Sequence, residues 1–287
     1  MSVAEETDPG SPDSHYDEIA EGYSRHWGPV IRPGAELVLD LVAPAIEATL
    51  PEAQATRLVD IGTGTGTLAI AALERWPAIR VTGIDPSGGM LALARKEAAE
   101  RLAPTVADRF ATEVAPADRL PFDDATVEHA VSSFVLQLVQ SRAAALREVL
   151  RILRPGGTFA WAAWQHSDVP YEPDRIANDE LDQAGFDPPE GGGRPGDIAS
   201  AEAAAAGMRR AGFRDVRAHI AELAHQWDAA GYLAFFTQFD EESLFADLDP
   251  NERLDIERRI RRRLDRLTPE QLTLRMPVIY VTGRAPG

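Results

Sequence analysis

The chain carries the decapeptide Leu58-Val59-Asp60-Ile61-Gly62-Thr63-Gly64-Thr65-Gly66-Thr67 at the end of a short apolar run. Residues 58–61 form a short segment with β-branched residues and are followed by glycine, which predicts a buried parallel strand. The apolar spacing after the glycines predicts a helix, so the glycines occupy a strand-to-helix turn. Glycine accepts a positive φ and lets a ligand approach the backbone, and a helix start leaves N–H groups free. The turn therefore predicts a site for a nucleotide-like or anionic group.

A second signal follows one helix later. Residues 80–85 predict the next strand, which ends in Asp85, 23 positions after Gly62. A carboxylate at this point can accept hydrogen bonds from both hydroxyls of a ribose. The alternative is that Asp85 is only the N-cap of the helix that begins near Pro86. Because the glycine turn comes before it, we favour the ribose.

Two further motifs, Leu120-Pro121-Phe122 and Leu153-Arg154-Pro155-Gly156-Gly157, follow in the chain. Together, the four motifs resemble those of the class I S-adenosylmethionine-dependent methyltransferases, within the branch that includes quinone-biosynthesis and small-molecule methyltransferases. The resemblance covers residues 56–164 most strongly. It implies an α/β fold with a Rossmann-like, doubly wound, seven-stranded sheet whose last strand is antiparallel. N-terminal lid helices and an inserted helical cap complete the expected architecture.

The resemblance also implies S-adenosylmethionine as the cofactor and S-adenosylhomocysteine as the product. The implied cofactor-binding residues are Tyr23, Asp60, Gly62, Thr63, Gly64, Gly66, Asp85, Pro86, Ser87, Met90, Ala117, Asp118 and Phe134. By this resemblance, Asp60 orders the first loop and the methionine amine, Asp85 holds the ribose, and Phe134 closes the methionine side. Ser87 and Met90 border the adenine.

The adenine edge departs from the usual family pattern. Ala117 and Asp118 are the residues that the resemblance brings to this edge, but Pro116 stands where an acid is common. We therefore expect Asp118 to take over the contact with the adenine amine.

Composition restricts the function classes. The 287 residues have a net charge of −17, which disfavours binding to nucleic acid or to an anionic membrane surface. The absence of cysteine excludes disulfides and cysteine-ligated metals, and we expect no metal site. Residues 1–13 lack the apolar core of a secretory signal, and no run approaches the ~18 apolar residues of a membrane span. We expect a cytoplasmic monomer or homodimer.

Residues 1–13 are expected to be a disordered tail, and residues 14–287 the methyltransferase domain. Tyr23 is the best lid candidate on an N-terminal helix, with Tyr16, His26 and Trp27 weaker. A helix over residues 34–50 should bury Leu37 and bend or split at Pro44. The remaining expected strands are 109–117, 127–133, 158–164, 213–221 and 276–282, and the expected helices are 89–102, 136–153 and 201–211.

The cap is expected to come from about residues 165–200 and 228–268. The first part is predicted to be irregular, with a glycine-rich loop over residues 188–196. The second should hold two helices, one around residues 232–239 and one beginning at Asp249. Phe235, Phe236 and Phe239 either pack this cap or line an apolar substrate pocket.

No catalytic base stands out. His166, after the fifth strand, is the best placed weak candidate, followed by His15 and His26. We expect methyl transfer to a small, apolar or aromatic acceptor, with O-, N- and C-methylation left open. One alternative is a non-catalytic S-adenosylmethionine-binding protein. A nicotinamide-dependent oxidoreductase is disfavoured because its third glycine would fall at position 67, which is Thr67.

Overall fold

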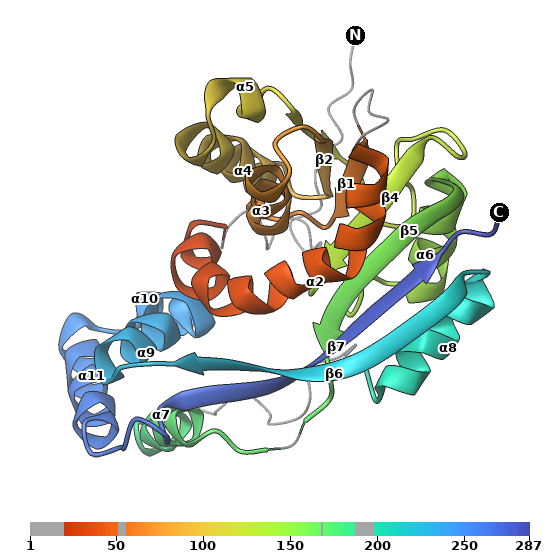
Figure 1. The fold of residues 1–287 in the computed structure, drawn as a ribbon. Coiled ribbons are helices and arrows are strands. Elements are labelled where there is room, and N and C mark those ends of the chain that lie inside the picture. Colours follow the sequence, from red (N-terminus) through yellow and green to blue (C-terminus); the bar gives the residue numbers. More distant parts are fainter. Residues whose placement is uncertain (1–19, 51–55, 168, 187–197) are drawn as a thin grey trace, which may run out of the picture.

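A computed structural model describes residues 20–50, 56–167, 169–186 and 198–287 (Figure 1). Its seven-stranded sheet has the order β3-β2-β1-β4-β5-β7-β6. The strands are β1 (Arg57–Ile61), β2 (Arg80–Asp85), β3 (Phe110–Val114), β4 (Val127–Ser133), β5 (Leu153–Trp164), β6 (Arg214–Gln226) and β7 (Thr273–Arg284). Strands β1 to β5 pair in parallel, whereas β7 is antiparallel to both β5 and β6. The predicted fold class, including the antiparallel last strand, is confirmed.

Helices cover both faces of this sheet (Figure 1). They are α2 (Gly28–Thr49), α3 (Thr67–Arg75), α4 (Gly88–Arg101), α5 (Pro104–Ala107), α6 (Arg142–Ile152), α7 (Glu172–Gln183), α8 (Ala201–Ala211), α9 (Ala229–Phe235), α10 (Glu242–Asp247) and α11 (Pro250–Leu264), with π-helical segments η1 (Tyr23–Trp27) and η3 (Phe236–Asp240). Successive residues of β1 point to opposite faces. Leu58 joins the hydrophobic cluster beneath α2 and α3, and Val59 joins the one beneath α6 and α8.

The long strands β6 and β7 extend away from the parallel part of the sheet and reach the cap helices (Figure 1). Their pairing continues to Gln226 opposite Thr273, at the end where α7, α9, α10 and α11 gather. The cap is fastened internally, because Arg263 of α11 donates to Glu180 and Asp179 of α7 at 2.8 and 2.9 Å. The cap is therefore a helical body carried at the end of a two-stranded ribbon.

The helix expected over residues 34–50 is longer than predicted. Helix α2 begins at Gly28 and continues without a break through Pro33 and Pro44. Burial of its apolar side, including Val38 and Ile46, holds the helix together despite the lost backbone bonds. Leu37 was expected in the core but is 42% exposed. The expected tail and the first part of the lid helix, with His15 and Tyr16, lie outside the described residues.

The helix after β4 starts later than predicted, at Arg142. Ser141 caps it by accepting a hydrogen bond from the N–H of Ala144, so residues 136–141 form a turn instead. The helix ends at Ile152, and the Arg-Pro-Gly-Gly motif that follows belongs to β5, which already begins at Leu153. The reason is a non-local pairing, in which Ala285 accepts from the Gly156 N–H and donates to the Gly157 carbonyl.

The cap also differs from its prediction. The segment expected to be irregular contains α7, which starts with Pro173 and acids in its first turn and buries Ile176 and Leu181. The second part forms α9, η3, α10 and α11 rather than two helices. The glycine-rich loop over residues 188–196 lies outside the described residues. The prediction for residues 201–211 is confirmed, with Ser200 as the N-cap.

Candidate functional site

The glycine turn after β1 is built from left-handed backbone conformations. Gly62, Gly64 and Gly66 have φ angles of 68°, 54° and 84°. The Gly62 N–H donates to the Ile84 carbonyl at 2.7 Å, which ties the turn to β2. A Cβ on Gly62 would lie 2.3 Å from the Val135 side chain, whereas a Cβ on Gly64 would meet nothing within 4 Å. Gly62 is thus required by packing, and the space beside Gly64 is open to a ligand.

The acid after β2 is joined directly to this turn. Asp85 is 9% exposed, and its Oδ2 accepts a hydrogen bond from the Gly64 N–H at 2.9 Å. Its Oδ1 accepts from the Ser87 N–H at 3.0 Å. Ser87, rather than Asp85, is the N-cap of α4, since its hydroxyl accepts from the Met90 N–H. The N-cap alternative for Asp85 is therefore wrong, and the two motifs that carried the prediction share one site.

Asp60 is a second acid at this site, and it is almost completely buried. The Thr63 hydroxyl donates to its Oδ2 at 2.7 Å, whereas its Oδ1 accepts no hydrogen bond of normal geometry from the described residues. Burial raises the pKa of Asp60 to about 7, although the Thr63 hydroxyl and the Ala69 N–H act in the opposite direction. A buried carboxyl with a spare oxygen suits a cationic hydrogen-bond donor.

The turn after β4 lies against the glycine turn through the contact of Val135 with Gly62. Phe134 has a φ of 59°, which is rare for a residue other than glycine. Two hydrogen bonds hold it there, one from its own N–H to the Ala162 carbonyl at 2.8 Å and one from Gln137 Nε2 to its carbonyl at 2.9 Å. Sequence reasoning missed Gln137, although a glutamine inside an apolar run was the available signal.

Phe134, at the carboxyl end of β4, is connected to η1 and to the cap helices through aromatic contacts. Its ring stacks on Trp164, with ring centroids 4.1 Å apart. Trp164 contacts Trp27 of η1 at 6.2 Å, and Trp27 stacks on Phe235 of α9 at 5.5 Å. We call these four residues the aromatic cluster. Phe235 and Phe236 are buried, which agrees with a packing role. The part that Trp164 plays in this cluster was not predicted from the sequence.

The remaining predicted residues lie around this frame. Met90 is buried near the start of α4, and Pro86 is partly exposed just before it. Ala117 is partly exposed and Asp118 exposed, shortly after β3, the strand that pairs with β2. Tyr23 contacts the edge of Phe239, with ring centroids 6.1 Å apart.

His166, the weak candidate for a base, is exposed directly after β5. Its backbone N–H donates to the Ile198 carbonyl at 3.1 Å. Neither histidine candidate within the described residues, His166 or His26, belongs to the turns that carry Gly64 and Phe134. The described residues contain no group of three metal-ligating side chains, and none of the described helices is both long and apolar enough to cross a membrane.

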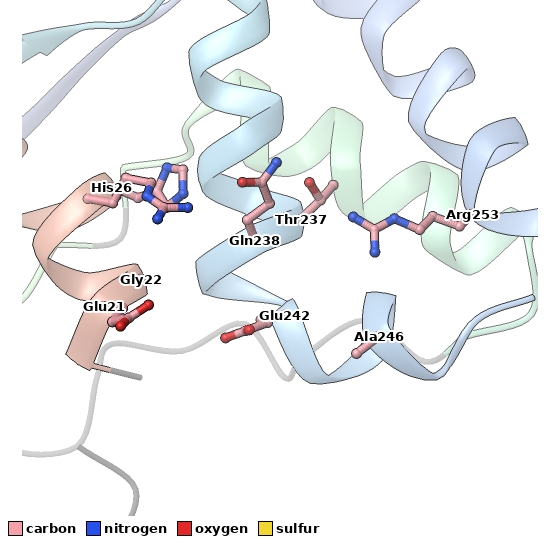
Figure 2. A pocket seen from close by; sticks show the side chains of 9 residues that line it. Glu21, Gly22, His26, Thr237, Gln238, Glu242, Ala246 and Arg253 are labelled. Atoms are coloured by element: carbon pink, nitrogen blue, oxygen red, sulfur yellow. The ribbon is translucent and has the colours of Figure 1, made fainter. Parts of the chain in front are cut away.

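A cavity of about 290 Å³ lies between η1 and the cap (Figure 2). It is lined by Glu21, Gly22, Arg25, His26, Thr237, Gln238, Glu242, Ala246 and Arg253. Burial, followed by the charge of Arg25, lowers the pKa of His26, against the effects of Gln238 and Glu242. Most lining side chains are exposed, and none is a predicted cofactor-binding residue. The cavity is therefore a polar groove between lid and cap, separate from the glycine turn.

Comparisons with known proteins agree with this arrangement. Residues 59–161 match the family model described as a methyltransferase domain. The ubiquinone/menaquinone biosynthesis C-methyltransferase UbiE of Geobacter sulfurreducens is 37% identical over 102 residues, which cover 35% of this chain and 39% of that protein. The chain thus spans about two fifths of the length of the curated relatives it matches.

Two solved structures share the fold along most of the chain. The [4+2]-cyclase SpnF has a TM-score of 0.59 at 18% identity, covering 96% of this chain and 94% of its own. Phosphoethanolamine N-methyltransferase 2 of Haemonchus contortus, in complex with phosphomonomethylethanolamine and S-adenosylhomocysteine, has a TM-score of 0.51 at 15% identity and covers 94% of this chain and 58% of its own.

Proposed function

We propose that this chain, which belongs to the class I S-adenosylmethionine-dependent methyltransferases by its fold and by residues 59–161, transfers a methyl group from S-adenosylmethionine to a small organic acceptor. S-adenosylhomocysteine is the second product. The observation that carries the proposal is the hydrogen bond from the Gly64 N–H to Asp85, at 2.9 Å. It brings an open glycine turn and a carboxylate suited to ribose within one hydrogen bond of each other.

The residues present fit the cofactor. The space beside Gly64 leaves room for a ligand close to the protein backbone. Asp60 Oδ1, which has no hydrogen-bond partner among the described residues, suits the methionine ammonium group. Asp85 would accept from the ribose hydroxyls, with Gly62, Thr63 and Gly66 shaping the turn beneath it. This division of roles gives each cofactor group a partner of matching polarity.

The adenine would lie at the start of α4. Met90 supplies an apolar surface there, and Pro86 and Ser87 border it. The last residue of β3 pairs with Asp85. Ala117 and Asp118 follow shortly after β3, and they would therefore be close enough to reach the adenine edge. The exposed Asp118 carboxylate would accept from the adenine amine.

The acceptor would be apolar or aromatic, because the ring of Phe134 in the turn after β4 stacks on Trp164 of the aromatic cluster. Phe134 would close the methionine side, and Tyr23 would cover the cofactor from the lid. When bound, the cofactor supplies a methyl group already activated by a sulfonium. The chain's own residues align donor and acceptor and exclude water, and such alignment can lower a barrier by ~7–11 kcal/mol. A protic acceptor would also lose a proton, and His166, which follows β5, is the candidate to accept it.

The fold alone does not fix the reaction, since one fold neighbour is described as a cyclase. A chain that binds the cofactor without turnover is therefore the second candidate. Thermal-shift and calorimetric comparison of S-adenosylhomocysteine with NAD tests the cofactor, and tighter binding of NAD would refute the proposal. A methyl-transfer screen over phenol, amine and quinone acceptors tests the activity. Cofactor binding without transfer to any acceptor class would favour the non-catalytic candidate.

A further inference from the structure

Gln137 has a buried oxygen that none of the described residues satisfies. The residue is 6% exposed, and its Nε2 donates to the Phe134 carbonyl at 2.9 Å. This bond fixes which end of the amide is the donor, because a carbonyl can only accept. The other end, Oε1, is buried and has no hydrogen-bond partner among the described residues. An unpaired buried acceptor in a native structure requires an explanation, and a donor supplied by a bound ligand is one.

The location of Gln137 limits what that donor can be. The segment after β4 is fastened to the glycine turn, since the Ser132 hydroxyl donates to the Ile61 carbonyl at 2.8 Å and Val135 fills the space beside Gly62. Asp60, two residues before Gly62, is the other buried residue of these two turns with an unpaired oxygen. Two buried acceptors therefore occur on two segments that touch each other.

We propose that Gln137 Oε1 accepts a hydrogen bond from the α-ammonium group of the bound cofactor, as a second acceptor beside Asp60. The inference rests on the proposed function. An ammonium group has three donors and no acceptor, so it needs more than one oxygen. The ribose hydroxyls and the adenine are already served by Asp85 and by the residues after β3. An amide oxygen also serves better than a second carboxylate, because two buried negative charges would repel each other when the site is empty.

The competing explanation is structural, namely that Gln137 only holds Phe134 in its left-handed conformation. Two variants separate the explanations. Gln137→Met and Gln137→Glu both lose the N–H that bonds the Phe134 carbonyl, but only the glutamate keeps an oxygen acceptor. Two ligands make the matched comparison, S-adenosylhomocysteine with its ammonium group and 5′-methylthioadenosine without the amino-acid chain.

The experiment is isothermal titration calorimetry on the full chain with both ligands. We expect Gln137→Met to weaken S-adenosylhomocysteine binding about tenfold, as for a hydrogen bond to a charged group, and to leave 5′-methylthioadenosine within about twofold. Gln137→Glu should bind S-adenosylhomocysteine clearly more tightly than Gln137→Met, while both variants melt at similar temperatures.

Equal loss of S-adenosylhomocysteine affinity in the two variants, or equal loss of both ligands in Gln137→Met, would overturn the inference in favour of the structural role. Unchanged affinity in Gln137→Met would overturn it as well. In these cases wild-type binding of S-adenosylhomocysteine leaves the proposed function standing. If the wild-type chain does not bind that ligand at all, the proposed function fails, and the inference fails with it.

Discussion

Two of the buried acids, Glu180 in the cap and Asp60 in the glycine-turn region, have different surroundings. Glu180 of the cap is 5% exposed, with Arg263 at 2.8 Å and Arg259 at 3.3 Å from its oxygens. Asp60 of the glycine-turn region is 1% exposed, accepts a hydrogen bond from the Thr63 hydroxyl, has no cation paired with it among the described residues, and has one oxygen without a hydrogen bond of normal geometry there. A buried charge without a partner is costly. Glu180 therefore has its cations within the cap, whereas Asp60 keeps an oxygen that a cationic ligand could satisfy.

The largest test of this comparison is the pH dependence of stability that Asp60 causes. Its folded pKa of about 7 lies above the ordinary value of 3.8, so the folded chain holds a proton that the unfolded chain releases. The stabilisation is complete below about pH 4 and is lost as pH rises to about 7. Three pKa units at about 1.36 kcal/mol each give a loss of about 4 kcal/mol.

Urea unfolding of the ligand-free chain and of Asp60→Asn between pH 4 and 8 measures this loss. The wild-type stability should decline relative to the variant as pH rises, because the variant has no carboxyl to ionise. A constant difference between the two would show that Asp60 ionises as easily as an exposed acid. The contrast drawn between Asp60 and Glu180 would then be wrong.

The second test concerns the backbone of the glycine turn. Gly62→Ala places a Cβ 2.3 Å from Val135 on a residue with a φ of 68°, so overpacking adds to backbone strain. We expect a loss of about 3 kcal/mol in unfolding free energy. Gly64→Ala is the matched control, since its Cβ meets nothing and only the strain of about 1–2 kcal/mol remains.

The Gly64→Ala variant, which should be the less destabilised of the two, should show the clearer loss of ligand affinity. Gly64→Ala fills the open space beside the backbone, so it should weaken S-adenosylhomocysteine binding although the chain stays folded. Urea unfolding and calorimetry on both variants provide the readouts. If Gly64→Ala bound that ligand as the wild type does, the open space beside Gly64 would not be a ligand site.

The two regions also differ in how far the sequence predicts them. Gly64 and Asp85 could be placed together because Gly64 closely follows one short apolar strand and Asp85 ends the next, and adjacent parallel strands bring such ends to one edge. Helix α7 was missed because few of its residues are apolar, and much of its stability comes from the tertiary packing of Ile176 and Leu181. The shift of the Arg-Pro-Gly-Gly motif into β5 depends on Ala285, which lies far along the chain.

At the candidate site, the sequence could indicate residue types but not whether their polar atoms have hydrogen-bond partners. The aspartate before the glycines was evident, yet its burial and its unpaired oxygen arise from the packing of several segments. Gln137 stands out in the sequence as a glutamine inside an apolar run, but its bond to the Phe134 carbonyl and its unpaired oxygen depend on the fold. Features set by local sequence were therefore predictable, whereas features set by contacts between distant parts of the chain were not.

The third test removes the acid that joins the two motifs. Asp85→Ala deletes the acceptor for the Gly64 and Ser87 N–H groups and for the proposed ribose hydroxyls. We expect S-adenosylhomocysteine binding to weaken by about 1–3 kcal/mol, the usual worth of charge-assisted hydrogen bonds. Calorimetry measures the change, with adenine alone as a control ligand that lacks the ribose. An unaltered affinity for S-adenosylhomocysteine would contradict the ribose role.

The smallest expected effect is in the cap, where Glu180→Gln keeps the shape of the side chain and removes its charge. Arg263 and Arg259 retain about a third of their side-chain exposure, so water can solvate them when the acid is neutralised. We therefore expect a loss of only about 1 kcal/mol in unfolding free energy, well below the cost of breaking a fully buried pair. High salt should reduce this loss, because it screens the ion pairs in the wild type. S-adenosylhomocysteine affinity should stay within about twofold of wild type, because Glu180 already has its cations within the chain. A marked fall in that affinity would mean that the ion pairs of the cap are coupled to the glycine turn, and that the two regions are not independent.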